Sequence, residues 1–170
     1  MLQPALFDLP SKYRNVNPKD VVFTPDNVAK TIVDLSNPSG VCLDPCRGEG
    51  AFYKYLPVGS LWCEIAEGKD FYSFSQKVDW IVSNPPYSEF DKWLFHSFEI
   101  ADNIVYLIPV YKVWKNWNVM MSIKKWGGVK AAYYLPASRA GFPFGFPAGA
   151  FHFQRGYTGA MEVFYAHDAT

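Results

Sequence analysis

The chain has 170 residues, 49% hydrophobic and 19% charged, which favours one folded domain over residues 1–170 rather than a disordered chain. Its formal net charge of +0 excludes a uniformly basic or acidic protein, and no apolar run approaches the roughly 18 residues of a membrane span. Its three cysteines (Cys42, Cys46 and Cys63) match neither a disulfide framework nor a zinc-binding pattern, so we expect a reduced, cytoplasmic protein without a metal site.

Short apolar runs alternate with amphipathic stretches along the chain, which predicts an α/β fold. Residues 1–22 form an irregular N-terminal arm in this interpretation. The sequence Thr24-Pro25-Asp26 is typical of a helix start, with Thr24 as the N-cap. The apolar face of that helix is expected to consist of Val28, Ile32 and Leu35.

The remaining elements are predicted from the same patterns. We expect strands over 41–44, 61–65, 78–83, 104–110, 129–135 and 161–166, and helices over 51–56, 89–101 and 111–126. The stretch 136–159, rich in Gly, Pro and Phe, separates the last two strands. It predicts a long loop in an antiparallel hairpin that closes an otherwise parallel sheet.

A loop with two glycines follows the first predicted strand directly. Its sequence is Asp44-Pro45-Cys46-Arg47-Gly48-Glu49-Gly50-Ala51-Phe52. Glycine lets the backbone approach a ligand closely, and ligands of such sheets bind at the carboxyl ends of the strands. Tyr53 stands in place of a third glycine and no Gly-Lys-Ser/Thr ending follows, so dinucleotide and P-loop nucleotide sites are disfavoured.

Two acids follow the second predicted strand. Glu64 offers two acceptor oxygens, which suit the two hydroxyls of a ribose. Asp70 would accept a hydrogen bond from an adenine amine, and Phe71 would pack on the same base. Each acid taken alone is better explained as an ordinary surface carboxylate, and only the neighbouring glycine loop favours a ligand.

The most specific motif is Asn84-Pro85-Pro86-Tyr87, which follows the predicted strand 78–83. The prolines restrict φ, so the carbonyl groups point in fixed directions. The Asn84 side-chain oxygen and the Pro85 carbonyl would accept both hydrogens of a planar amine and aim its lone pair at an incoming methyl group. Tyr87 would stack on the base, which must be flipped out of a duplex or already unpaired. The alternative is a proline-rich turn without chemistry.

In their order along the chain, Thr24-Pro25, the loop 44–52 and Asn84-Pro85-Pro86-Tyr87 resemble the N6-adenine DNA methyltransferases of the gamma class. The resemblance, over residues 20–110, implies a class I S-adenosylmethionine-dependent methyltransferase: a Rossmann-like, mostly parallel seven-stranded sheet with an antiparallel C-terminal hairpin. It also implies an intracellular bacterial or phage-encoded enzyme that methylates the N6 amine of adenine in DNA. The implied catalytic residues are Asn84, Pro85, Pro86 and Tyr87. The implied cofactor-binding residues are Thr24, Pro25, Asp44, Pro45, Cys46, Gly48, Gly50, Phe52, Glu64, Asp70, Phe71 and Asn84.

The chain departs from this family in two ways. Only forty positions separate Asp44 from Asn84, so the helices between those strands must be short or missing. No target-recognition domain follows the catalytic sheet. We therefore expect a single-stranded or weakly specific DNA substrate, or RNA, with a second copy or a partner subunit supplying target recognition.

Charge is unevenly distributed, and one basic region is a candidate nucleic-acid surface. Residues 1–102 carry nine Lys/Arg and fourteen Asp/Glu, whereas 103–160 carry seven Lys/Arg and no acid. The candidate contacts are Lys112, Trp114, Lys115, Lys124, Lys125 and Arg139. A solvated amphipathic helix with its tryptophans in the core, Trp117 above all, is the alternative.

Three other functions stay open. The same chemistry on RNA adenine is compatible with every motif. Protein-glutamine methyltransferases that act on release factors also use Asn-Pro-Pro-Tyr, although their glycine loop usually lacks the Asp-Pro start. A methyltransferase fold that has lost turnover and serves as a binding protein is the last alternative, which the intact motif at Asn84 disfavours.

Overall fold

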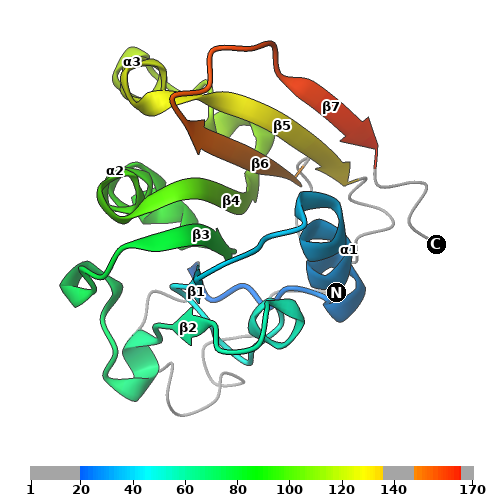
Figure 1. The fold of residues 1–170 in the computed structure, drawn as a ribbon, viewed down its shortest axis with the longest axis vertical. Coiled ribbons are helices and arrows are strands. Elements are labelled where there is room, and N and C mark those ends of the chain that lie inside the picture. The colour runs from blue at the N-terminus through cyan, green and yellow to red at the C-terminus, as the bar shows by residue number, and fades with distance from the viewer. Residues whose placement is uncertain (1–19, 136–147, 166–170) are drawn as a thin grey trace.

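The computed structural model describes residues 20–135 and 148–165, which form an α/β fold around one seven-stranded sheet (Figure 1). The strands are β1 (Cys42–Asp44), β2 (Leu61–Trp62), β3 (Val78–Ser83), β4 (Ala101–Pro109), β5 (Gly127–Leu135), β6 (Ala148–Arg155) and β7 (Glu162–Tyr165). The α-helices are α1 (Asp26–Ser36), α2 (Phe90–Ile100) and α3 (Trp117–Trp126). The 3₁₀ helices are η4 (Tyr53–Tyr55), η5 (Ile65–Glu67), η6 (Phe71–Ser73), η7 (Tyr87–Glu89) and η8 (Val110–Lys112).

The sheet has the strand order β2-β1-β3-β4-β6-β5-β7. β1 pairs in parallel with β2 and β3, and β3 pairs in parallel with β4. β6 runs antiparallel to both β4 and β5, so the predicted mostly parallel sheet with an antiparallel hairpin is confirmed. The carboxyl ends of β1 to β4 therefore lie along one edge of the sheet, where ligands of such folds bind.

The hairpin itself differs from the prediction. β6 lies within the stretch 136–159 that the sequence pattern assigns to a single loop; residues 136–147 of that stretch are outside the described ranges. β5 pairs antiparallel with β6, while β7, the expected partner, joins β5 in parallel. The start of β6, Ala148-Gly149-Ala150, has low strand propensity, but its position between β4 and β5 gives it partners on both sides, and this pairing outweighs propensity.

Helix α1 confirms the predicted helix but not its N-cap. Pro25 occupies the cap position, and the Thr24 hydroxyl instead accepts a hydrogen bond from Asn84 Nδ2 at 3.1 Å. Ile32 is fully buried, whereas Leu35, expected on the same face, is 36% exposed. Asn37 ends the helix in the left-handed conformation, with φ of 48°, and its amide donates to the Val33 carbonyl.

The connections between β1 and β3 are short, as the forty-residue spacing predicts. Instead of the predicted helix over 51–56 the chain forms only the 3₁₀ helix η4, and the predicted strand over 61–65 is reduced to the two residues of β2. The predicted helix over 111–126 is also divided, into η8 and α3. In all three places the sequence pattern predicts the right kind of element, but the helix or strand that forms is shorter than predicted.

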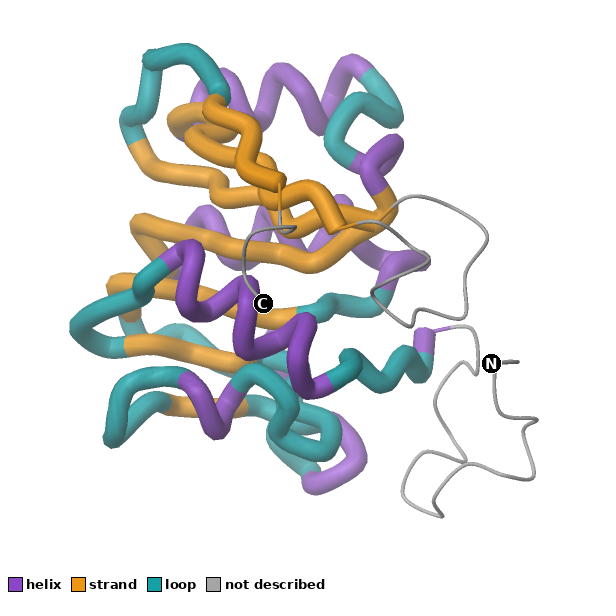
Figure 2. The backbone as a smooth tube through the Cα atoms, turned by 90° about the vertical axis from the view of Figure 1, so that its right-hand side faces the viewer, coloured by secondary structure: helices purple, strands orange, loops and turns teal. Residues whose placement is uncertain are grey.

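The helices cover the sheet on both faces, α1 on one and α2 with α3 on the other (Figures 1 and 2). Alternate residues of β4 serve the two layers, because successive side chains of a strand point to opposite faces. Val105 and Leu107 pack with α1, while Ile104 and Tyr106 pack with α2 and α3. None of the helices in the described ranges is both long enough and apolar enough to cross a membrane.

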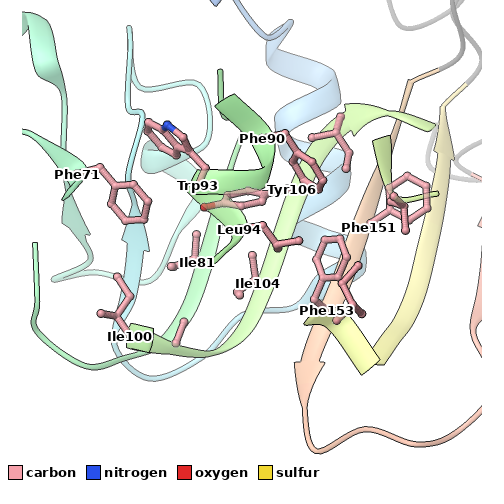
Figure 3. Packing of buried hydrophobic residues seen from close by; sticks show 14 of the residues in the cluster. Phe71, Ile81, Phe90, Trp93, Leu94, Ile100, Ile104, Tyr106, Phe151 and Phe153 are labelled. Atoms are coloured by element: carbon pink, nitrogen blue, oxygen red, sulfur yellow. The ribbon is translucent and has the colours of Figure 1, made fainter. Parts of the chain in front are cut away.

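Aromatic rings fill much of the layer beneath α2 and α3 (Figure 3). Phe90, Phe151 and Phe153 are exposed by no more than 2%. Tyr106 is fully buried as well, and its hydroxyl shares a hydrogen bond of 2.6 Å with Ser97 Oγ, so the polar atom it brings into the core has a partner.

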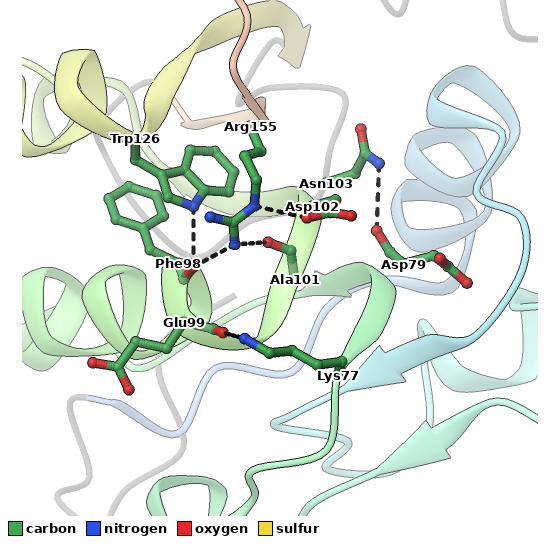
Figure 4. A network of polar contacts seen from close by, with 9 residues as sticks. All are labelled: Lys77, Asp79, Phe98, Glu99, Ala101, Asp102, Asn103, Trp126 and Arg155. Carbon is green, nitrogen blue, oxygen red and sulfur yellow. Dashed lines mark hydrogen bonds and ion pairs between the residues drawn. The ribbon is translucent and has the colours of Figure 1, made fainter.

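A polar network joins the end of α2 to the hairpin at the edge of the sheet away from the carboxyl ends of β1 to β4 (Figure 4). Arg155, the last residue of β6, donates to the carbonyls of Phe98 and Ala101 and to the carboxylate of Asp102. Trp126 Nε1 donates to the same Phe98 carbonyl at 3.0 Å. These donors satisfy carbonyls that the end of a helix leaves without intrahelical partners.

The core under α2 and α3 gives a direct stability test. Replacing the fully buried Phe153 with Ala is expected to lower the free energy of unfolding by about 3–5 kcal/mol, through lost transfer energy and the cavity left behind. The matched control is Phe164→Ala in β7, where the ring is 40% exposed and the expected loss is about 1 kcal/mol or less. Urea unfolding followed by tryptophan fluorescence measures both values, and equal losses would contradict the assignment of Phe153 to the core.

Candidate functional site

A cavity of about 650 Å³ opens at the carboxyl ends of β1, β2 and β3. Ten of the residues predicted from the sequence line it: Thr24, Pro45, Cys46, Gly48, Phe52, Glu64, Asp70, Phe71, Asn84 and Pro86. Five others, Pro25, Asp44, Gly50, Pro85 and Tyr87, are not part of its lining. The predicted residues come from distant parts of the sequence, and the parallel pairing of the strands brings them together.

The glycine loop bends tightly after β1. Gly48 and Gly50 have φ values of 54° and 86°, in the left-handed region that favours glycine. A Cβ on Gly50 would meet no atom within 4 Å, so backbone conformation and not crowding requires glycine there. The loop is tied to the end of β2, because Arg47 N donates to the Cys63 carbonyl at 3.0 Å.

Asp44 lies beneath this loop and is fully buried. Its Oδ1 accepts hydrogen bonds from Ser83 Oγ at 2.7 Å and from Cys46 N at 3.4 Å. Among the described residues, none is hydrogen bonded to its Oδ2. Burial raises the pKa of the carboxyl group from its ordinary value of 3.8 to about 7, against the opposing effect of the Ser83 hydrogen bond. A buried carboxyl group with one unsatisfied oxygen is suited to a cationic or hydrogen-donating ligand.

Glu64 connects the glycine loop to the turn that follows β2. It is 3% exposed, and its Oε2 accepts from Gly48 N at 2.7 Å while its Oε1 accepts from Ala66 N at 3.0 Å. A carboxylate oxygen can accept two hydrogen bonds, and each oxygen of Glu64 accepts one from the backbone. Glu64 therefore holds the loop and still presents acceptors to the cavity that it lines.

Asp70 and Phe71 form the next part of the wall. Asp70 caps η6 by accepting from Tyr72 N at 3.1 Å, and Phe71 is 2% exposed with its ring 4.6 Å from that of Trp93. His96 Nε2 lies 3.1 Å from the Phe71 carbonyl, which fixes the turn to α2. Sequence reasoning missed Tyr72 and Trp93, which also line the cavity, because neither lies in a recognisable motif.

The Asn84 side chain is oriented by the segment that precedes α1. Its Nδ2 donates to Thr24 Oγ1 at 3.1 Å and to the Val22 carbonyl at 3.4 Å. A carbonyl oxygen only accepts, so the group facing Val22 must be the amide nitrogen. Asn84 Oδ1 is then directed elsewhere; it is buried, and no described residue is hydrogen bonded to it.

The other end of the Asn84–Tyr87 motif is held by Lys112, which follows β4. Tyr87 is 9% exposed, and burial raises the pKa of its hydroxyl group. Its carbonyl accepts a hydrogen bond of 2.7 Å from Lys112 Nζ, and Lys112 itself is only 8% exposed. Burial lowers the pKa of the Lys112 ammonium group. The prediction that Lys112 contacts nucleic acid is therefore wrong: its amine supports the segment Asn84–Tyr87 from inside the fold. We refer to this segment, after its predicted role, as the target segment.

The segment 20–24 is a further part of the site, of which the sequence pattern revealed only Thr24. All five of its residues line the cavity. Asp20 accepts hydrogen bonds from Ser88 N at 3.0 Å and from Ser88 Oγ at 2.5 Å. The end of the predicted irregular arm thus lies over the target segment. Polar residues in an extended stretch give no periodic signal that would have predicted this.

The other candidate nucleic-acid residues fall in two separate places. Trp114 and Lys115 follow η8 at the carboxyl end of β4, next to the target segment, and Trp114 is 48% exposed. Lys124 and Lys125 are exposed at the end of α3, which leads into β5 at the opposite edge of the sheet. Arg139 lies outside the described residues. Within the described ranges, no group of three His, Cys, Asp or Glu residues is arranged to hold a metal ion.

No protein-family model matches the chain, and no curated protein matches it in sequence. Its structure is similar to solved structures at low sequence identity. One is a Pyrococcus horikoshii protein described as an RNA methyltransferase, with a TM-score of 0.66 and 18% identity over 88% of this chain and 94% of that chain. Another is a class I S-adenosylmethionine-dependent methyltransferase from Listeria monocytogenes, with a TM-score of 0.63 and 12% identity over 94% of this chain and 69% of that chain.

A third similar structure is a modification subunit of a type I restriction enzyme from Vibrio vulnificus, with a TM-score of 0.60 and 14% identity. The match covers 90% of this chain and 48% of that chain, so this chain spans about half of the subunit's length. Together these similarities confirm the predicted fold class: the chain has the class I methyltransferase fold.

The raised pKa of Asp44 predicts a pH-dependent stability. Between pH 3.8 and about 7 the folded state keeps a proton on Asp44 that the unfolded state releases, so this group's contribution to stability falls as pH rises through that window. The isosteric variant Asp44→Asn lacks this titration. We expect the free energy of unfolding of the native protein, measured by urea titration at several pH values, to fall relative to that of the variant from pH 4 to 7. Parallel curves would contradict the raised pKa.

Proposed function

We propose that the chain transfers a methyl group from S-adenosylmethionine to the N6 amine of adenine in a nucleic acid, with DNA as the first candidate. The observation that carries this proposal is the buried Asn84 Oδ1, which has no hydrogen-bond partner among the described residues while Thr24 and Val22 hold the amide in one orientation. An acceptor kept in this state is suited to an amine hydrogen that arrives with a substrate.

The residues of the cavity fit the proposed cofactor. Its volume of about 650 Å³ lies in the range of small-molecule sites. Glu64 presents acceptors for ribose hydroxyls, and Asp70 with Phe71 would hold the adenine. Asp44, which lies outside the lining, would hold the glycine loop in place by accepting a hydrogen bond from Cys46 N. When bound, S-adenosylmethionine supplies an electrophilic methyl group on a positively charged sulfur.

The target segment positions the amine. The Asn84 side-chain oxygen and the Pro85 carbonyl accept its two hydrogens, which turns the nitrogen lone pair toward the methyl group and stabilises the positive charge that develops on nitrogen. After transfer the surplus proton leaves to water, so no strong base is needed. The proposed stacking of Tyr87 on the base requires its ring, now 9% exposed, to be uncovered when substrate binds.

RNA is the second candidate substrate, and the similarity to the Pyrococcus protein described as an RNA methyltransferase favours it. For DNA, the similarity to the Vibrio modification subunit supports a further proposal. Because that protein is a subunit of a larger enzyme, we infer that a second copy or a partner subunit works with this chain in target recognition.

The decisive experiment supplies labelled S-adenosylmethionine with duplex DNA, single-stranded DNA, RNA or a release-factor protein in separate reactions. Label at adenine N6 in a nucleic acid is the expected result. Label in the protein substrate alone would overturn the proposal in favour of glutamine methylation, and label in none would favour a binding protein that has lost turnover.

Asn84→Ala tests the residue that carries the proposal. Its turnover is expected to fall by about 10²–10³-fold, because one of the groups that stabilise the transition state is lost. Cofactor affinity, measured by calorimetry, should change much less. The matched control is Asn103→Ala, an amide at the start of β4 that donates to the Asp79 carbonyl away from the cavity. Unchanged turnover in Asn84→Ala would remove this residue from the mechanism.

A further inference from the structure

Three aromatic side chains are exposed within seven residues that follow β4. Tyr111 is 58% exposed, Trp114 is 48% exposed and Trp117 is 75% exposed. We refer to these three residues as the aromatic corner. Exposing a tryptophan to water is costly. Two exposed tryptophans three residues apart, with an exposed tyrosine nearby, are more than the scattered single apolar residues that protein surfaces normally carry.

The aromatic corner is held in place rather than left loose. The Trp114 ring packs edge-on against the buried Phe151 ring, with centroids 5.6 Å apart. Asn116 Oδ1 accepts from Val119 N at 2.9 Å and so caps α3, which fixes the backbone of the first-turn residue Trp117. The Lys112 ammonium group lies 5.7 Å from the centre of the Tyr111 ring. Rings on a fixed backbone lose less conformational entropy when a ligand stacks on them than rings on a loose one.

The aromatic corner adjoins the target segment. β3 and β4 are parallel neighbours, so η8, which follows β4, lies beside the Asn84 segment, which follows β3. Lys112 connects the two directly through its hydrogen bond of 2.7 Å to the Tyr87 carbonyl. The cavity is lined by residues 20–24, by parts of the stretches 45–52, 64–72 and 84–89 and by Trp93 of α2. It includes no residue of the aromatic corner. The corner is therefore outside the cofactor site but beside the target segment.

Charge favours a polyanion at this place. Residues 103–160 contain no Asp or Glu, and Lys115 lies between Trp114 and Trp117 of the aromatic corner in the sequence. Its nearest acid is Asp91 of α2, with Nζ and Oδ2 separated by 3.9 Å and Lys115 45% exposed, a weak pair that a phosphate can displace. Lys124 and Lys125 lie seven and eight residues beyond Trp117, about 10–12 Å along α3, so they do not belong to the same contact.

We propose that the aromatic corner binds the unpaired bases that flank the target on a single-stranded nucleic acid, with Lys115 on an adjacent phosphate. This proposal rests on the proposed function, since it specifies the substrate of the same site. A single strand is favoured over a duplex because its bases have free faces, whereas bases in a duplex are already stacked on one another.

The test measures binding of a fluorescent oligonucleotide, as a single strand and as a duplex of the same sequence, without cofactor. The single strand is expected to bind more tightly. Trp117→Ala should weaken its binding by about tenfold, because one stacked base is lost. Trp117→Phe should restore most of the affinity. Tyr165→Ala is the matched control, since Tyr165 is 62% exposed but lies in β7 at the far edge of the sheet, and should change nothing.

Salt dependence tests the phosphate contact. Lys115→Gln should reduce the slope of log affinity against log salt by about one, while Trp117→Ala leaves the slope unchanged. Equal affinity for single strand and duplex, or unchanged binding by Trp117→Ala, would overturn the proposal. The proposal would also be overturned if Trp117→Ala lowered only the methylation of a protein substrate and left oligonucleotide binding unchanged.

The outcomes also separate this proposal from the proposed function. If the single strand binds tightly through Trp117 but no nucleic acid is methylated, the proposed function is refuted and the role of the aromatic corner in binding is supported. Adenine methylation that is unaffected by Trp117→Ala would remove the aromatic corner and leave the activity.

Discussion

The hydrogen bond between Ser83 Oγ and Asp44 Oδ1 is the interaction on which the site depends. Both residues are fully buried, and the bond joins the carboxyl ends of two neighbouring parallel strands. Asp44 begins the glycine loop beside the cavity, and Ser83 directly precedes Asn84. One buried contact of 2.7 Å therefore sets the distance between the proposed electrophile and the proposed acceptor of the target amine. Positioning of this kind accounts for much of what an enzyme without a strong base can contribute.

Much of the fold could be predicted from sequence because local patterns and tertiary structure agree there. β3 occupies the predicted residues 78–83, and α2 differs from its predicted range by one residue at each end. The glycine loop and the Asn84 segment follow their strands as expected, so strand pairing alone brings them to one cavity. In each of these places, apolar periodicity and turn residues indicate the same boundary.

The parts that could not be predicted depend on contacts between distant residues. β6 starts with small residues of low strand propensity and is a strand because β4 and β5 pair with it on both sides. Lys112 looks like a surface lysine in sequence, but its amine reaches the Tyr87 carbonyl from a buried position. Trp117 shows the opposite case: its apolar ring suggests a core position, but the residue is 75% exposed. Composition does not distinguish these cases, because burial is a property of the packed chain.

The uneven charge distribution now has a structural interpretation. Five acids of the first 102 residues line the cavity, where they would attract the cationic sulfur and amine of the proposed cofactor: Asp20, Glu49, Glu64, Asp70 and Glu89. Residues 103–160, which contain no acid, supply η8 and α3, and none of these residues described by the structure lines the cavity. A cationic cofactor and an anionic strand would then approach Asn84 from sides of opposite charge, so each ligand is attracted to its own side and repelled from the other.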